Sequence, residues 1–268
     1  MNNKILAIAQ NTFREAIRQK LLYGLIFFTV LLIFAARFLG NLSIGGAETK
    51  IVKDMGLASI FLMGTFISLS MGISLVFKEI DRKTIYTILA KPVSRFEFIL
   101  GKFVGLIVTV GVELFLMTLL LFAMLKTYPE PLDWNLWKAV ILIYMELCVL
   151  ISITLVFSSY SSSFMTSLFC FSFLILGHLT DDLASILVDK IHWMQKKNLL
   201  TPAKEMTYKF LESAVKVFNL DHFSINSKIV HGVPISWGYV GNTFLYGLCY
   251  VLIFLMVSNY LFSRKDLK

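Results

Sequence analysis

The chain has 268 residues and a formal net charge of +8, and 57% of its residues are hydrophobic while only 16% are charged. A soluble domain carries about 25% charged residues, so this composition excludes an ordinary soluble enzyme or binding domain. Apolar runs of about 20 residues recur and indicate a polytopic membrane protein. Lys and Arg on its cytoplasmic side account for the net charge, and no nucleic-acid partner is expected.

The sequence predicts an all-α integral membrane protein with six transmembrane helices in a single domain, residues 1–268. Each apolar run is long enough to cross about 30 Å of hydrocarbon as a helix. In chain order, the expected spans are about 21–40, 57–77, 103–125, 137–157, 164–187 and 238–262.

Residues 1–20 are expected to form an amphipathic helix ahead of the first span. Lys4, Arg14 and Arg18 lie off an apolar stripe on one face of this helix. The stripe comprises Ile5, Ile8, Ala9, Thr12, Phe13, Ala16 and Ile17. This pattern favours an interfacial helix along the inner surface of the membrane. A cytoplasmic extension of the first span is the alternative.

Residues 78–102, here called the charged segment, separate the second span from the third. Their charged side chains are Lys78, Glu79, Asp81, Arg82, Lys83, Lys91, Arg95, Glu97 and Lys102. Because this segment and the two chain termini concentrate Lys and Arg, the positive-inside rule places all three in the cytoplasm.

The charged segment has the pattern of a helix, a break and a second helix. Apolar periodicity predicts a short amphipathic helix over Ile80–Ala90, which Pro92 ends. Ser94 and Glu97 then have the spacing of a capping box at the start of the next helix. A rigid element with a charged face suggests docking of a partner. The alternative is a solvated loop that serves only to set the topology.

Two further features accompany the spans. Gly101 and Gly105 form a small-xxx-small pair, which permits close approach of another helix. The outer loop 178–237 contains a helical pattern over 202–218, which predicts a small extracytoplasmic helical cap. The four histidines are His178, His192, His222 and His231, and all lie in this loop. They lack the spacing of metal ligands, so no metal site is expected.

Glu113 and Glu146 fall near the centres of the third and fourth expected spans. A carboxylate at this depth costs a few kcal/mol and usually faces protein or water. One interpretation is a polar translocation path or a proton-linked site. The other is a protonated carboxyl group that bonds a nearby hydroxyl and holds helices together. The candidate hydroxyls are those of Thr109, Thr118 and Ser152.

The charged segment resembles the cytoplasmic signature of type-2 permease subunits of ATP-binding-cassette (ABC) transporters. That pattern has Glu, four residues, Thr, an apolar helix, Pro-Val-Ser-Arg, an acidic residue and an apolar-Gly-Lys ending. The matching residues are Glu79, Thr84, Pro92, Val93, Ser94, Arg95, Glu97, Leu100, Gly101 and Lys102. Lys83 departs from it, because the family commonly has Gly there. The span layout extends the resemblance over the whole chain. Within the family, the chain is similar to the group that includes nitrous oxide reductase accessory permeases, which serve copper-enzyme maturation.

The resemblance implies a non-catalytic permease of a bacterial cytoplasmic (inner) membrane with both termini cytoplasmic. Two copies, or one copy and a paralogue, would each dock a separate ABC ATPase through the charged segment. The docking residues it implies are Glu79, Asp81, Arg82, Lys83, Thr84, Lys91, Pro92, Ser94, Arg95 and Glu97. ATP and Mg would be bound by that ATPase. In this chain Phe96 and Phe103 stand where a phosphate-binding loop needs Gly and Ser or Thr.

Two other functions stay open at this point. An ion-coupled secondary transporter or channel would use Glu113 and Glu146 as coupling sites. A mechanotransmission complex would instead pass motion to an extracytoplasmic partner without moving a substrate. An intramembrane hydrolase is not expected, because Ser70 lacks a nucleophile motif.

Overall fold

The computed structural model describes residues 2–42, 48–81, 94–131, 133–196, 206–207 and 219–264. The elements are α1 (Asn2–Ile17), α2 (Lys20–Asn41), α3 (Glu48–Asp81), α5 (Arg95–Leu125), α6 (Leu136–Tyr160), α7 (Ser163–His178), α8 (Thr180–Lys196), η1 (Asp221–Phe223), α10 (Asn226–Val230) and α11 (Trp237–Arg264). These described residues hold helices and no strand. Five helices are long and apolar enough to cross a membrane, or six if the bent pair α7–α8 counts as one span. The predicted all-α integral membrane protein is confirmed.

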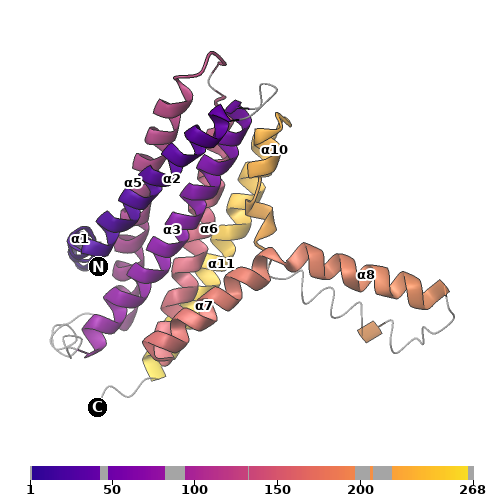
Figure 1. The fold of residues 1–268 in the computed structure, drawn as a ribbon. Helices are drawn as coiled ribbons and strands as arrows, with labels where there is room; N and C mark the ends of the chain where they lie inside the picture. The colour runs from indigo at the N-terminus through magenta and orange to yellow at the C-terminus, as the bar shows by residue number, and fades with distance from the viewer. Residues whose placement is uncertain are drawn as a thin grey trace.

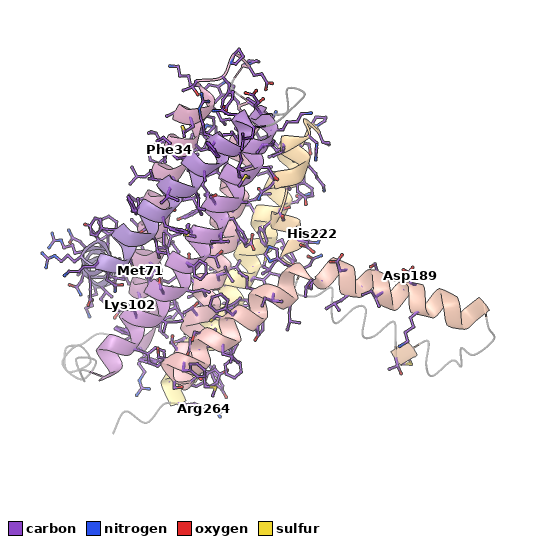
Figure 2. The ribbon with its side chains drawn as sticks, viewed as in Figure 1. Phe34, Met71, Lys102, Asp189, His222 and Arg264 are labelled. Carbon is purple, nitrogen blue, oxygen red and sulfur yellow. The ribbon has the colours of Figure 1, made fainter. Side chains whose placement is uncertain are left out.

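Helix α6 forms the centre of the bundle. It packs against α3, α5, α7 and α11, and most of its length is buried by these neighbours. Leu142, Leu147 and Leu150 on different sides of α6 have no exposed surface. Helix α2, at the edge of the bundle, leaves Phe27, Phe34 and other large apolar side chains exposed (Figure 2). An apolar face of this kind is suited to lipid.

Helix α1 crosses the bundle instead of extending α2. Figure 1 shows α1 nearly end-on, whereas α2, α3 and α5 lie close to the plane of the view. The two helices are separated at Arg18 and Gln19, so the alternative of one continuous helix is wrong. Lys4, Arg14 and Arg18 are exposed as expected. That α1 lies on the membrane surface stays a prediction.

The glycine pair of α5 receives α1. A Cβ atom on Gly101 would lie 2.6 Å from Cβ of Ile8, and one on Gly105 would lie 2.7 Å from the main-chain oxygen of Ala9. Both distances are shorter than real Cβ atoms allow, so only glycine permits this contact. The predicted close approach at these glycines is confirmed, and the partner is the N-terminal helix. Part of the apolar stripe of α1 therefore packs against protein, because Ala9, Thr12 and Ala16 are buried.

The fifth expected span, 164–187, is not a straight helix. Helix α7 has 16 residues, which gives about 24 Å at 1.5 Å per residue, short of the hydrocarbon thickness. After His178 the chain bends by 57° into α8, which leads away from the bundle in Figure 1. Asp189 on α8 lies far from the helices of the bundle (Figure 2). The sequence did not indicate this bend, because the apolar run continues past the residue at which the helix ends. That residues 164–187 form the fifth span stays a prediction.

Gly177 in the last turn of α7 and Thr180 just after it pack against protein, and the terminal carbonyl groups of α7 accept hydrogen bonds. Leu179 N donates to Ile175 O at 3.0 Å, and the hydroxyl of Thr180 donates to Leu176 O at 2.9 Å. Leu220 N, from the returning chain, donates to Gly177 O at 3.0 Å. These bonds satisfy main-chain acceptors that a helix end otherwise leaves free.

The chain that returns after α8 fills space beside α6 and α11. Phe223 of η1 is 1% exposed, and Ile225 is fully buried. A Cβ atom on Gly247 of α11 would lie 3.0 Å from the ring of Phe223, so η1 and α11 are in close contact. Residues 219–230 are therefore packed deeper than the extracytoplasmic cap expected from the sequence. Of the helix expected over 202–218, only residues 206 and 207 are described, and they are helical.

The contact between α1 and α5 can be tested with a glycine substitution. Gly105→Ala should lower the melting temperature of the purified protein in detergent, because the methyl group overlaps Ala9 and Thr12 of α1. Overpacking of this kind costs about 1–3 kcal/mol. Gly24→Ala in α2 is the matched control, since a Cβ atom there has no atom within 4 Å. Equal melting temperatures for the two variants would contradict the packing of α1 on Gly105.

Candidate functional site

The structure describes part of the charged segment. Helix α3 continues to Asp81, so Glu79, Ile80 and Asp81 belong to a helix that is continuous with the second span. Arg82, Lys83, Thr84, Lys91 and Pro92 lie outside the described residues. The short helix expected up to Ala90 and the break at Pro92 therefore stay predictions. From Ser94 onward the side chains can be placed.

Ser94 and Glu97 form the predicted capping box, which is confirmed. The main-chain nitrogen of Glu97 donates to the Ser94 hydroxyl at 3.2 Å, and the nitrogen of Ser94 donates to Oε2 of Glu97 at 2.8 Å. Two donors at the start of α5 are satisfied reciprocally in this way. The carboxylate also lies at the positive end of the helix dipole. Both side chains thus define the first turn of α5.

Arg95 contacts the opposite end of the chain. Its Nη1 atom donates to Phe262 O at 2.6 Å and to Ser263 O at 2.9 Å, which are main-chain acceptors at the C-terminus of α11. The guanidinium carbon lies 5.8 Å from the centre of the Phe262 ring. The rings of Phe98 and Phe262 stack at 5.7 Å beneath this contact. A cation at this position complements the negative end of the α11 dipole.

Lys102, the last residue of the charged segment, is buried as well. It is 1% exposed, and its Nζ atom lies 5.9 Å from the centre of the Phe98 ring. Figure 2 labels Lys102 below Met71, near the end of the bundle that holds the start of α5. The sequence counted Lys102 only as one of several positive charges. With Arg95 and Glu97, it shows that the part of the segment on α5 directs its charges into the protein.

Glu113 on α5 is buried without a hydrogen-bond partner among the described residues. It is 4% exposed, and neither carboxyl oxygen has a bonded neighbour in that part of the chain. The hydroxyl groups of Thr109 and Thr118 donate to carbonyl oxygens of their own helix instead. The hydroxyl of Ser152 does the same in α6. The hydrogen bonds expected between Glu113 and these hydroxyls are therefore not formed.

Glu146 on α6 has a basic partner that the sequence did not indicate. Its Oε1 atom lies 3.3 Å from Nε2 of His178, the last residue of α7, and Glu146 itself is 1% exposed. The ring of His178 lies 5.4 Å from the ring of Phe61 on α3. Sequence reasoning grouped His178 with the outer loop. Its position inside the apolar run 164–187 was the signal that it could be buried.

The other histidines do not join this pair in a metal site. Among the described residues, no group of three or more His, Cys, Asp and Glu side chains could hold a metal ion. His222 belongs to η1 (Figure 2), and its ring packs edge-on against the ring of Tyr246 at 5.7 Å.

The apolar bundle, the bent fifth span and the buried carboxylates define a multi-pass membrane protein with no catalytic constellation among its described residues. The family model of the ABC-2 family transporter proteins matches residues 6–267. The chain therefore belongs to this family and is a membrane subunit of an ABC transporter. A comparison with curated proteins found no match.

The contact of Arg95 with α11 can be tested by substitution. Arg95→Ala should lower the free energy of unfolding by about 1.5–3 kcal/mol, the usual contribution of hydrogen bonds to a charged group. Arg264→Ala is the control, because Arg264 lies at the same end of α11 but stacks on Tyr260 of its own helix at 4.6 Å. Thermal unfolding in detergent measures both. An Arg95→Ala variant as stable as Arg264→Ala would contradict the contact.

Proposed function

We propose that this chain is the permease subunit of an ATP-driven export complex. Two copies, or one copy and a paralogue, would each dock a separate ABC ATPase on the charged segment. The observation that carries the proposal is the family match over nearly the whole chain. The capped start of α5, which lies within the charged segment, supports it. ATP and Mg would be bound by the ATPase, and this chain would hold no cofactor.

The packing of α5 suggests how motion of the charged segment reaches the bundle. The first turn of α5 contacts α11 through Arg95, and the next turns contact α1 through Gly101 and Gly105. Helix α11 in turn packs along α6 over much of its length. Ser258 of α11 accepts or donates a hydrogen bond with Ser159 of α6 at 3.1 Å. A displacement of the start of α5 would therefore move α1 and α11 with it, and not α5 alone.

The placement of side chains narrows the docking surface. Ser94, Arg95 and Glu97 already bond within this chain, so they position α5 instead of facing a partner. The charges left for the ATPase are those of the preceding part of the segment. They are Glu79, Asp81, Arg82, Lys83 and Lys91, with Thr84 among them and Pro92 directly after Lys91.

Two finer assignments belong to the same proposal. Both termini would be cytoplasmic in a bacterial inner membrane, which the Lys and Arg distribution supports. The chain would also belong with the permeases of copper-enzyme maturation, a grouping supported by the pattern of the charged segment. An ATPase gene beside that of the chain, together with genes for such an enzyme, is the observation that would support the second assignment.

Capture of the partner ATPase tests the docking surface. The chain should be tagged and purified from membranes of its native cell, and a co-purified ATPase identified by mass spectrometry. Arg82→Glu with Lys83→Glu should abolish its recovery, because the change reverses the charge of the docking face. Lys126→Glu is the matched control, since Lys126 is an exposed cation at the other end of α5. Absence of an ATPase with the unchanged chain would overturn the proposed function.

A second pair of variants separates docking from transmission. Arg95→Ala should leave the ATPase bound but reduce the stimulation of ATP hydrolysis by the permease, because α11 no longer follows α5. Arg95→Lys keeps the charge but donates in a different geometry. Its stimulation of ATP hydrolysis should lie between those of the unaltered chain and of Arg95→Ala. If Arg95→Ala loses the ATPase as completely as the Arg82 and Lys83 double variant, Arg95 belongs to the docking surface and the proposed path through α11 is wrong.

A further inference from the structure

The contact between His178 and Glu146 joins three parts of the chain in the middle of the bundle. His178 is the last residue of α7, Glu146 lies halfway along α6, and the returning segment bonds the adjacent Gly177 through Leu220 N. Leu220 also packs against Gly177, where a Cβ atom would lie 2.5 Å from its side chain. The contact therefore lies where the chain bends out of the bundle and where it returns.

One hydrogen bond and one ion-pair contact of His178 restrict how many protons the pair can hold. Its Nδ1 atom lies 3.2 Å from Leu174 O, and since a carbonyl only accepts, Nδ1 carries a hydrogen. Nε2 then faces Oε1 of Glu146 at 3.3 Å. A favourable contact needs one hydrogen between these two atoms, either on the imidazole or on the carboxyl group. With none, the lone pair of Nε2 faces a carboxylate, which is repulsive. With two, the imidazolium faces a neutral carboxyl group, whose carbonyl oxygen accepts more weakly than a carboxylate does.

Burial also favours one proton. With one proton the pair has no net charge, whether as an ion pair or as two neutral groups. Loss of it leaves a single anion on Glu146, whose side chain is 2% exposed, and this state carries a large desolvation cost. Gain of a second proton leaves a single cation on His178, whose side chain is 27% exposed. Asp221 of η1 is the charged neighbour that interacts electrostatically with Glu146.

Several other titratable groups lie on the elements packed around the pair. Helix α11 contributes Tyr246 and Tyr250, whose rings lie 4.8 Å apart, and η1 contributes Asp221 and His222. Helix α6 itself carries Tyr144 and Cys148, α7 carries Cys170, and α5 carries Glu113. Helix α8 begins with Asp181 and Asp182, α10 carries Lys228, and α3 faces His178 with Phe61. Among these, Asp221 is the carboxylate placed to act on Glu146.

We propose that His178 and Glu146 form a binding site for a single proton, and that this proton holds the end of α7 against α6. Release of the proton would leave a buried carboxylate beside Asp221 and weaken the attachment of α7 and of the returning segment. The site would make the bend at His178 sensitive to pH. The inference concerns contacts within this chain and does not depend on ATPase docking.

Infrared spectroscopy of the unaltered protein in nanodiscs, with isotope-labelled histidine, tests the site directly. Because one proton serves both groups, a pH titration should change a carboxyl band and an imidazole band together, with the same midpoint. Glu146→Gln should remove that carboxyl band and also shift the imidazole transition. Glu113→Gln is the matched control, since Glu113 is a buried carboxyl group without a histidine partner. It should remove a different band and leave the imidazole transition unchanged.

Stability against pH gives the second readout. The melting temperature of the unaltered protein should fall as the pH rises through the shared transition. Glu146→Gln and His178→Gln should each abolish that fall, and the double variant should resemble either single variant. Separate midpoints for the two bands, or additive effects of the two substitutions on the pH dependence, would overturn the proposal. A failure of ATPase capture would leave this result unaffected, so the two proposals fail independently.

Discussion

Main-chain polar groups need partners wherever water is excluded, and this constraint determines how the helices of this protein begin and end. Helix α7 ends beside the middle of α6, and its last carbonyl groups accept from Leu179, Thr180 and Leu220. Helix α11 ends where Arg95 donates to two of its carbonyl groups. At each of these helix ends, at least one donor comes from a distant part of the chain, namely Leu220 for α7 and Arg95 for α11. The bonds that satisfy the main chain are therefore the same bonds that join α5 to α11 and α7 to the returning segment.

The features that could be predicted from the sequence are local ones. The apolar runs, the spacing of Ser94 and Glu97, and the pair Gly101 and Gly105 each depend on residues a few positions apart. The contact of Arg95 with Phe262 joins residues 167 positions apart. A charge beside other charges is expected to face water unless the fold brings an acceptor to it. For the same reason, nothing near Lys102 in the sequence indicated that it is almost fully buried.

The bend after His178 was missed for a different physical reason. Hydropathy averages over a window, and the apolar residues of α7 and the start of α8 merge into one run. The returning chain at Asn219–Ile225 is short and carries polar residues, so its average does not indicate burial. Yet Leu220, Phe223 and Ile225 are among the most buried side chains of the protein. A broken span can be identified only when the segment that completes it is found far along the chain.

The inward placement of Arg95 and Glu97 changes the meaning of the family pattern in the charged segment. Ser94 and Glu97 cap the start of α5, and Arg95 bonds the end of α11. Each polar residue in this part of the pattern therefore has a role within the chain. A docking role is not needed to account for these residues. Under the proposed function, recognition of the ATPase would then fall to the earlier part of the pattern, from Glu79 to Lys91. The second part of the pattern positions the start of α5, and the first part would contact the partner.

The two core carboxyl groups show why position along a span does not determine function. Glu113 and Glu146 each lie near the middle of a long helix, and both are almost completely buried. Glu146 has an imidazole 3.3 Å away because α7 ends at the same depth. Glu113 has no bonded partner in the described part of the chain, so an ionised carboxylate would be costly there. The difference between them arises because α7 ends beside Glu146. Of the two, Glu146 is the one with a second titratable group with which to share a proton.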